Sequence, residues 1–564
     1  RRIDALAAVT GRKVFAMDLD VEGALPTMVC RPPTINGTAE ELLNHDEIVA
    51  MPGVKDVAVI PHVSKDILTI AGGVAVRAQT FGQCVDAIRA MKVRWSPGTA
   101  AGKTVDSVLG DLRAAELPLA PAVGTAIEQE FVFHFRPGDP LETNCAVADV
   151  RADRAEIWAP LKSPIWAQQR IAQDLGLSVD QVAVHVTEGG GSFGRHLFAD
   201  GAMEAAHISR AFGNKPVRLM WARADGPRQG RCHPMSIVRN RATHDGTQVT
   251  TFSQRLTSVA TDFTMGFGEM ITGLLATPPD GNLGYAQTIY NLTANVPYNF
   301  GVVDMAINEV YEYNTFNTSS VRNIYSPEVR TSVELITDQL AQALKKDPLE
   351  FRLEYARDDR MKAVLEKVKA ASRWGRALPA GVAQGVAVHR EYKGFAACVV
   401  EIDCRPRTVN RKKIGGKTGP RVRRVTYVVD VGLPINPLGL KAQMMGGIMD
   451  GIGQVLTYCL HLQDGAFLEA SWDNAFYTRQ WNVPPKVQVI VMPPTTDHPG
   501  GAGEFGVAAS MAATACAYGR AVGKMPTTFP IDYDNLGFKP YPFEPPIPAS
   551  PRNGLKYRKA PKQH

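Results

Sequence analysis

The sequence lacks the cysteine patterns of metal-binding domains. Its 564 residues include eight cysteines, and no two of them are spaced as C-x-x-C. This absence argues against a zinc ribbon, an iron–sulfur cluster or a c-type haem site within the chain. Scattered thiols in a large chain are typical of a reducing compartment. We therefore expect a cytoplasmic protein, with export or membrane association through an upstream segment or a partner as the alternative.

Long apolar runs and a strong net charge are also missing. No stretch of about 18 apolar residues occurs, so no membrane span is expected. The net charge of +6 is small for this length, and part of it lies in a basic run from Arg405 to Arg424. That run has no interleaved aromatic residues, which favours a solvated loop or hairpin over a nucleic-acid patch. Nucleic acid is therefore not an expected partner.

Length and composition indicate a large globular protein with several domains. Hydrophobic residues make up 45% and charged residues 21% of the chain, which is ordinary for a protein that buries large cores. Short alternating apolar runs, interspersed with helical patterns, predict a mixed α/β or α+β fold. The predicted domains cover residues 1–100, 126–378 and 379–530, with a linker at 101–125 and a proline-rich tail at 531–564.

A glycine-rich loop, Gly189–Arg195, lies between a predicted strand at 182–186 and a predicted helix at 198–212. Another predicted strand follows at 217–221, so the segment has the order of a β-loop-α-β crossover unit. Glycines at such a place let backbone N–H groups approach a ligand closely. The loop is therefore a candidate binding site.

The same loop satisfies the dinucleotide-binding pattern G-x-G-x-x-G. The acidic residue that would hold the ribose, Asp225, lies 31 residues beyond Gly194, whereas the pattern places it about 20 residues on. NAD or FAD binding and a purely structural turn thus stay open as alternatives. An anionic or carbonyl-bearing cofactor of another kind is favoured.

A second glycine-dense turn, Pro499–Gly506, presents one carboxylate, Glu504, just before an alanine-rich helical stretch. Local rules favour an ordinary acidic residue at a helix start, and the alternative is a catalytic base. Three other segments have the same ligand-facing character. They are Leu141-Glu142-Thr143, the segment that begins at Arg322 before a helix predicted at 332–343, and the glycine-rich stretch 436–453. Glycine in a helix costs about 1 kcal/mol relative to alanine, so close packing or a ligand is expected to compensate in that stretch.

Taken together, these segments resemble the large, molybdenum-binding subunit of the xanthine dehydrogenase and aldehyde oxidase family of molybdenum hydroxylases. Within the family they are most similar to the isoquinoline 1-oxidoreductase beta-subunit type. The likeness extends over nearly the full length, because residues 11–18 and 51–54 look like the family's α/β hammerhead domain and the five motifs follow in the family's order. The resemblance implies a hammerhead domain followed by two molybdopterin-binding domains.

The resemblance also implies a reaction and its residues. It indicates an oxidoreductase that hydroxylates an N-heterocycle or an aldehyde with water-derived oxygen, using molybdopterin, expected as the cytosine dinucleotide, whose dithiolene holds the metal without protein ligands. Glu504 matches the family's base, and burial should raise its pKa. Arg322 matches an arginine that stabilises developing negative charge. The implied cofactor-binding residues are Gly190, Gly191, Ser192, Phe193, Gly194, Arg195, Arg322, Gln443, Gly446, Gly447, Gly501, Gly503 and Ser510.

The sequence departs from the family after Arg322, where Asn323-Ile324-Tyr325 replaces a glycine-rich continuation. No cysteine lies in that loop, which argues against the carbon-monoxide-oxidising branch. Because the chain has no cluster motif of its own, the resemblance implies a small partner subunit with two [2Fe–2S] clusters. A subunit with FAD or a haem cytochrome would accept electrons next, within a possible dimer of heteromers. The alternatives are an NAD- or FAD-binding oxidoreductase and a cofactor-free scaffold.

Overall fold

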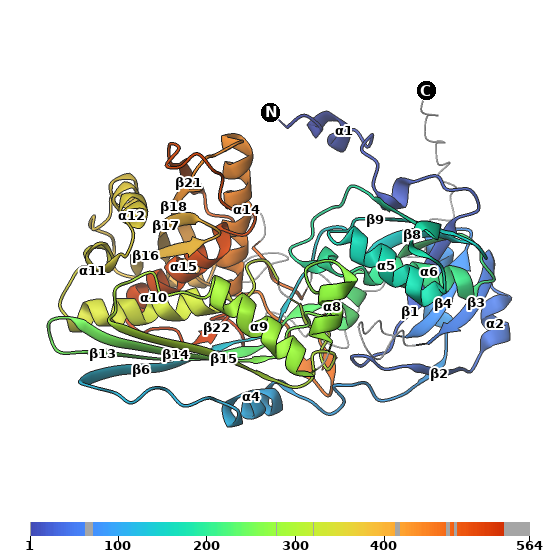
Figure 1. Cartoon of the computed structure of the whole chain (residues 1–564), viewed down its shortest axis with the longest axis horizontal. Helices are drawn as coiled ribbons and strands as arrows, with labels where there is room; N and C mark the ends of the chain where they lie inside the picture. The colour runs from blue at the N-terminus through green and yellow to red at the C-terminus, as the bar shows by residue number, and fades with distance from the viewer. Residues whose placement is uncertain are drawn as a thin grey trace.

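The computed structural model describes residues 2–61, 72–277, 279–319, 321–411, 418–469, 474–478 and 482–534. Residues 412–417 of the basic run, and the proline-rich tail from 535 onward, lie outside the described residues. The fold is mixed α/β and has two lobes that lie side by side, each with its own large sheet or sheets (Figure 1). No helix in the described part of the chain combines the length and the hydropathy of a membrane span.

One lobe contains a seven-stranded sheet in the order β10-β9-β8-β11-β1-β4-β3. Its helices α5 (Pro164–Leu175) and α6 (Asp200–Ala211) pack beside one another and bury their apolar faces with Trp166, Met203 and Phe212. The strands are β1 (Leu25–Cys30), β3 (Val54–Ile60), β4 (Gly73–Ala78), β8 (Cys145–Val150), β9 (Ala155–Ala159), β10 (Val182–Val186) and β11 (Val217–Met220).

The sheet of this lobe joins strands from distant parts of the sequence. Strand β1 pairs in parallel with β11, with Leu25 opposite Val217, so N-terminal strands share a sheet with strands from beyond residue 140. Strands β10 and β11 and the helix α6 between them form the predicted crossover unit, with β9 and β8 inserted between the two strands. The predicted domain bounds and the hammerhead form of residues 1–100 stay predictions.

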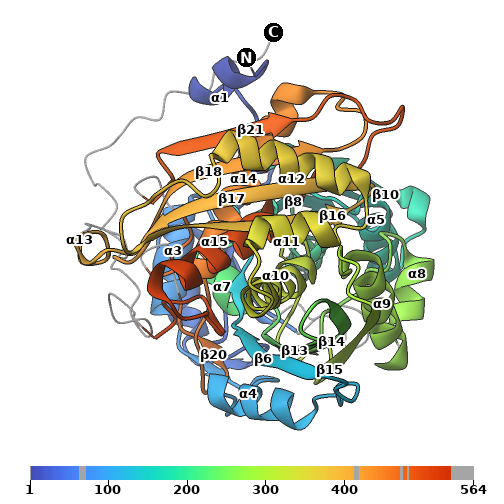
Figure 2. The ribbon, with the colours of Figure 1, turned by 90° about the vertical axis from the view of Figure 1, so that its left-hand side faces the viewer.

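The other lobe is layered, as Figure 2 shows. A five-stranded sheet, β15-β14-β13-β6-β22, contacts α10 (Ser326–Ala343), and a four-stranded sheet, β16-β17-β18-β21, contacts α15 (Gly506–Val522). Helices α10 and α15 pack against each other between the sheets, while α12 (Asp359–Ser372) covers the far face of the four-stranded sheet. The strands are β6 (Thr125–Phe133), β13 (Ser236–His244), β14 (Val249–Val259), β15 (Val302–Val310), β22 (Thr528–Phe529), β16 (Val382–Glu391), β17 (Gly394–Asp403), β18 (Arg421–Asp430) and β21 (Lys486–Val491).

Helix α15 runs through the centre of this lobe. Its residues from Gly506 to Ala517 are all buried, and most of them are small. A helix that is apolar on all sides must be covered on all sides, and small side chains let its neighbours approach closely. Helix α14 (Pro437–Leu456) packs along it on one side. The start of α15 is therefore fixed from several directions, and Glu504 lies just before it.

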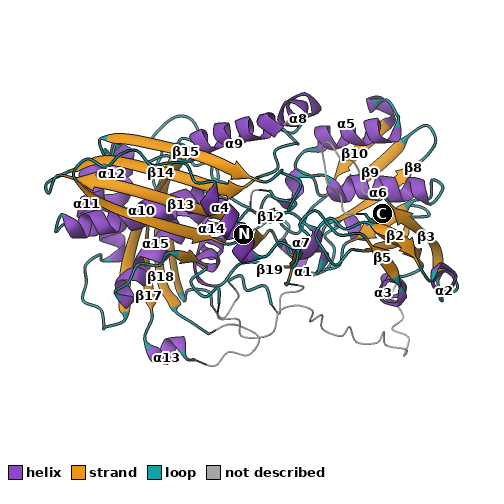
Figure 3. Cartoon of the chain, turned by 90° about the horizontal axis from the view of Figure 1, so that it is seen from below, coloured by secondary structure: helices purple, strands orange, loops and turns teal. Residues whose placement is uncertain are grey.

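Helix α10 begins at Ser326, six residues before the predicted start at 332. Pro327 stands in its first turn, where a proline has no N–H to leave unpaired and its fixed φ suits a helix. Loops gather between the two lobes (Figure 3). They include the glycine-rich loop, which follows β10, and the segment that leads into α10.

Candidate cofactor and active site

Residues from both lobes line a cavity of about 690 Å³, here called the Glu504 cavity. On the side of the lobe with the seven-stranded sheet, the glycine-rich loop forms the wall. The segments around Arg322, α14 and the Glu504 turn form the opposite wall. The structure thus brings together four motifs that are far apart in the sequence. The predicted site residues that line this cavity are Ser192, Phe193, Gly194, Arg322, Gln443, Gly446, Gly501, Gly503 and Glu504.

The glycine-rich loop contains several residues with positive φ. Gly191 and Gly194 have φ values of +106° and +102°, which side-chain-bearing residues rarely adopt, and Phe193 itself has a φ of +51°. The backbone N–H of Gly190 donates to Oε2 of Glu142 over 2.8 Å. A Cβ at Gly190 would lie only 2.6 Å from Cβ of Glu142. The Leu141-Glu142-Thr143 motif therefore supports the loop from behind, and Gly190 needs to be glycine for packing.

Arg322 connects three of the site's segments. Its Nη1 donates to Oδ2 of Asp450 at 2.7 Å, and its Nη2 donates to the carbonyl oxygens of Gln443 and Gly503 at 3.2 and 3.1 Å. The side-chain amide of Gln443 also donates to the Gly503 carbonyl. Arg322 is 7% exposed, whereas Gln443 and Gly503 are exposed, so the network joins a buried guanidinium to the open side of the cavity. It fixes the Glu504 turn against α14 and keeps the guanidinium at the cavity wall.

Glu504 lies half-buried at the wall of the cavity. Burial raises the pKa of its carboxyl, as the sequence predicted, and the nearby charge of Glu391 raises it further. The backbone N–H of Asn323, together with Lys162 and Arg322, acts in the opposite direction and favours the carboxylate. The balance is a carboxyl group that binds a proton more tightly than an ordinary glutamate, which suits an acid–base role.

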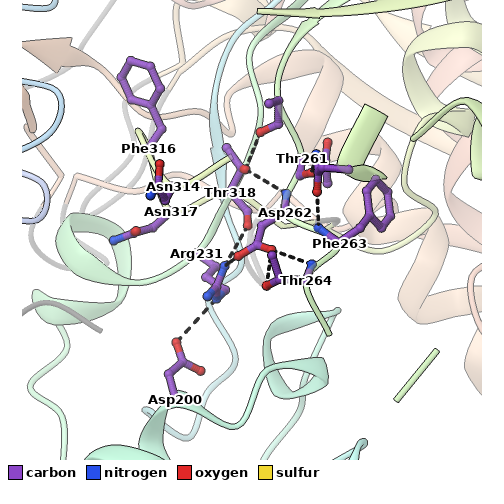
Figure 4. Close-up of polar contacts among 12 residues, drawn as sticks. Asp200, Arg231, Thr261, Asp262, Phe263, Thr264, Asn314, Phe316, Asn317 and Thr318 are labelled. Carbon is purple, nitrogen blue, oxygen red and sulfur yellow. Dashed lines mark hydrogen bonds and ion pairs between the residues drawn. The ribbon is translucent and has the colours of Figure 1, made fainter. Parts of the chain in front are cut away.

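Arg195 is a predicted cofactor-binding residue whose side chain points away from the cavity. Its guanidinium makes two hydrogen bonds of 2.8 Å to Asp200 at the start of α6, and both residues are buried. Asp200 in turn faces Arg231 at 3.6 Å, and Arg231 pairs with Asp262 at 2.6 Å (Figure 4). This chain of buried charges anchors the end of the glycine-rich loop to the loops between the lobes.

Gly447 and Ser510 also lie outside the cavity, where α14 and α15 pack together. A Cβ at Gly447 would come within 2.8 Å of Cα of Gly506, and one at Gly451 within 2.3 Å of the Ser510 hydroxyl oxygen. That hydroxyl donates to the Gly506 carbonyl at 2.6 Å within its own helix. Close helix packing therefore accounts for Gly447 and Gly451. The sequence had left two explanations for the glycines of this stretch, close packing and a ligand. The predicted cofactor contacts of Gly447 and Ser510 stay predictions.

A second cavity of about 330 Å³ shares Phe193, Arg322 and Gly446 with the first, and Gly190 lines it too. Its other lining residues include aromatic and apolar side chains and two carboxyl groups, those of Asp139 and Asp450. Burial raises the pKa of Asp139 to about 6. The remaining residues that line it are Pro137, Gly138, Leu141, Val321, Met449, Gln454, Tyr458, Tyr477 and Thr478.

Sequence reasoning missed several residues of the site. Lys162, Tyr392 and Ala502 line the Glu504 cavity, and neither Lys162 nor Tyr392 belongs to a motif. Asp139 had a signal in the sequence, because the pair Gly138-Asp139 stands just before the Leu141 motif. Gly191 lines neither of the two cavities, and its nearest neighbours are the Phe193 ring and Pro140.

Two glycines at the Glu504 cavity test whether its residues fit a molybdopterin cofactor. A Cβ at Gly503 would meet nothing within 4 Å, and one at Gly446 would meet only the guanidinium of Arg322 at 3.5 Å. Neither glycine has a φ in the left-handed region, so the fold does not require them. A ligand lying against bare backbone explains them. Lys162, Ser192, Arg322 and Gln443 add cationic, hydroxyl and amide groups that suit a phosphate and the polar edge of a pterin, so the residues fit.

Comparisons with known proteins agree with this fit. Residues 106–356 and 366–479 match two family models, each described as a molybdopterin cofactor-binding domain. Together these matches take in more than half of the chain. The fold and the cavity thus define a molybdopterin-binding protein. More particularly, the chain belongs to the molybdenum-binding subunits of the xanthine dehydrogenase and aldehyde oxidase family.

Several relatives carry names of oxidoreductases. Isoquinoline 1-oxidoreductase subunit beta of Brevundimonas diminuta is 26% identical over 517 residues, which cover 86% of this chain and 61% of that protein. A membrane-bound aldehyde dehydrogenase (pyrroloquinoline-quinone) of Gluconacetobacter polyoxogenes is 25% identical over 553 residues, which cover 90% of this chain and 68% of that protein. The chain therefore spans only about three fifths of the first relative's length.

The fold also matches that of a solved structure. Quinoline 2-oxidoreductase from Pseudomonas putida 86 superposes with a TM-score of 0.73 over 94% of this chain and 96% of that one, at 14% sequence identity. At this identity the likeness concerns the fold. It is the same mixed α/β arrangement that carries the two cavities described above.

Proposed function

We propose that the chain is the catalytic, molybdopterin-binding subunit of a hydroxylase or dehydrogenase that oxidises an N-heterocycle or an aldehyde. The observation that carries this proposal is the position of Glu504. Its half-buried carboxyl, with a raised pKa, lies at the wall of a cavity whose other residues fit the cofactor. A carboxyl held in this way can accept a proton at a pH where an ordinary glutamate would hold one only weakly.

In this proposal the cofactor lies in the Glu504 cavity against the bare backbone at Gly446, Gly501 and Gly503. Gln443 and the glycine-rich loop bind it from opposite walls, and the cytosine dinucleotide is its proposed form. The molybdenum cofactor, when bound, would supply a two-electron redox centre and an oxygen derived from water. Glu504 would hold the proton released at this wall of the cavity, and Arg322, fixed by Asp450 and Gly503, would hold positive charge at the same wall.

The second cavity supports a planar substrate. Tyr458, Tyr477, Phe193 and Met449 offer apolar and aromatic surface, and the two cavities share the Phe193–Arg322 wall. A flat ring suits such a pocket, and relatives named for isoquinoline and quinoline make an N-heterocycle the first substrate class to test. The aldehyde class is supported by the name of another relative.

Partners are part of the same proposal. A relative's name includes the words subunit beta, which supports a complex of several subunits here too. Electrons would leave through a small subunit with [2Fe–2S] clusters, and a subunit with FAD or a haem cytochrome would follow. The scattered spacing of the eight cysteines supports a cytoplasmic location.

The test is to purify the complex, determine its metal content, and identify the extracted cofactor by mass spectrometry. We expect molybdenum and a molybdopterin, and oxidation of isoquinoline or an aldehyde with an artificial electron acceptor. Glu504→Gln should abolish turnover while molybdenum content stays unchanged. Pyrroloquinoline quinone, NAD or FAD in this chain, or a complex without molybdenum, would refute the proposal.

A further inference from the structure

The tight hairpin between β16 and β17 contacts the Glu504 turn. Strands β16 and β17 are joined at Tyr392 and Lys393, which both have positive φ, at 48° and 64°. The N–H of Gly501 donates to the Tyr392 carbonyl at 2.9 Å, and a Cβ at Gly501 would lie 2.6 Å from Cβ of Tyr392. The end of β16 and the Glu504 turn are therefore locked together.

Glu391, the last residue of β16, is the centre of a buried hydrogen-bond cluster. Its Oε2 accepts from the Asn323 amide at 2.7 Å and from the Ser326 hydroxyl at 2.9 Å, and lies 2.8 Å from Nε2 of His389. All four residues are buried. These donors, with His389 first among them, outweigh the effect of burial and hold the pKa of Glu391 below its ordinary value. Glu391 is thus a buried anion that lies behind the wall of the Glu504 cavity.

Asn323 links this cluster to Glu504. Its side chain binds Glu391, and the residue before it, Arg322, donates to the Gly503 carbonyl next to Glu504. The Asn323 backbone N–H also favours the carboxylate of Glu504 and lowers its pKa. Asn323 and Ile324 both have positive φ, at 83° and 42°, which is unusual for a residue with a side chain and especially for a β-branched one. Such a conformation persists only where its surroundings hold it, and Glu391 is the partner that holds the Asn323 side chain.

We propose that Glu391 is a positioning residue for the base: by binding the Asn323 amide it fixes the loop that presents the Asn323 N–H to Glu504, and it places a negative charge beneath that carboxyl. The role rests on the proposed function of Glu504. Glu391 does not line the Glu504 cavity and acts through Asn323 and through space. The two effects on Glu504 have opposite signs, since the hydrogen bond favours its carboxylate and the charge favours its protonated form.

The charged and titratable groups around this pair come from several segments. Glu504 faces Lys162, which precedes α5, and Arg322, which precedes α10. Tyr392, at the tip of the hairpin, faces both Glu504 and Glu391. Glu391 also faces His389 on its own strand and Arg330 on α10. Only Glu391 adds negative charge to Glu504 among the groups that shift its pKa most.

Two variants separate the charge from the anchor. In Glu391→Gln, the amide oxygen can take the place of Oε2 and keep the hydrogen bonds, while the negative charge is lost. In Asn323→Gly, the charge stays and the positive φ is allowed, but the side-chain anchor is removed. The matched control is Glu401→Gln, which removes another buried carboxylate from the opposite end of the same two strands.

The measurement is the pH at which Glu504 becomes half protonated, followed in the purified holoenzyme by carbodiimide labelling and peptide mass spectrometry. The acidic limb of kcat/KM for isoquinoline gives a second value for the same group. We expect the midpoint to fall by about one pH unit in Glu391→Gln and to rise in Asn323→Gly, because each variant removes one of the two opposing effects. In Glu401→Gln it should not move.

A midpoint that is unchanged or higher in Glu391→Gln, or unchanged in Asn323→Gly, would overturn the positioning role. A purely structural role lowers activity or thermal stability in both variants without moving the midpoint. If the labelling midpoints move as expected while no form of the enzyme oxidises isoquinoline or an aldehyde, the proposed function fails and the positioning of Glu504 by Glu391 stands.

Discussion

Replacing Gly503 with leucine should weaken cofactor binding without weakening the fold. A Cβ at Gly503 meets nothing within 4 Å, and its φ lies outside the left-handed region. A compatible glycine replacement changes the free energy of unfolding little, or raises it by about 0.4–1 kcal/mol through the unfolded chain. The larger side chain would instead occupy the Glu504 cavity, where we place the cofactor.

The expected loss follows from the overlap of the leucine with the cofactor. Forcing extra methylene groups into a filled space costs about 1–3 kcal/mol. Each 1.4 kcal/mol is tenfold in affinity, so cofactor binding should weaken by roughly 5- to 100-fold. Molybdenum per protein, measured by plasma mass spectrometry, should fall while the thermal midpoint of the apoprotein stays within a few degrees.

The matched control is Gly110→Leu, because a Cβ at Gly110 on α4 (Val105–Ala114) also meets nothing within 4 Å and no residue of that helix lines either cavity. It should keep full molybdenum content. If Gly503→Leu also keeps its molybdenum and its activity, the cofactor does not lie against this turn, and the explanation offered for its bare backbone is wrong.

The other predictions concern packing, charge and pH. Gly447→Ala should lower the free energy of unfolding by about 1–3 kcal/mol, because the new Cβ would lie 2.8 Å from Cα of Gly506; urea unfolding measures it, and an unchanged midpoint would contradict the packing argument. Asp200→Asn should cost about 3–5 kcal/mol in the same assay, since it leaves Arg195 buried without its charged partner; a loss below 1 kcal/mol would show that the pair is dispensable. Asp139 has a pKa raised to about 6, above its unfolded value, so its contribution to stability is present below about pH 4 and is lost as pH rises through 6. Asp139→Asn should remove that loss. The free energy of unfolding of the variant, minus that of the unmodified protein, should be higher at pH 7 than at pH 4 by up to about 2–3 kcal/mol. A difference that is the same at both pH values would contradict this.

Local sequence rules predicted the helices and strands that carry the site more accurately than their ends. The strand at 182–186 and the crossover to 217–221 were predicted, and almost all of the glycine-rich stretch at 436–453 lies in helix α14. Helix α10 was predicted six residues too short, although the Ser326–Pro327 pair is an ordinary helix start. Tertiary packing buries its first turn almost completely, and periodicity alone does not show where such burial begins.

Motif order predicted the cavity residues better than it predicted their roles. Glu504, Arg322 and Gln443 lie together as expected, because the chain brings its glycine-rich turns to one place. Gly447 and Ser510 were in the right segments but face the contact between α14 and α15. A helix presents only part of its circumference to a cavity, so the motif does not say which of its residues face the ligand.

The sequence by itself determined the class of protein, the mixed α/β fold and the identity of the candidate base, because these depend on residue types in a fixed order. Only the tertiary structure decided that Glu391 and Asn323 stand behind Glu504, that Lys162 and Tyr392 join the wall of its cavity, and that Arg195 faces away. The physical reason is that proton affinity and ligand contact depend on distance and burial. Those are set by segments, such as the β16–β17 hairpin and the start of α10, that meet only in the folded chain.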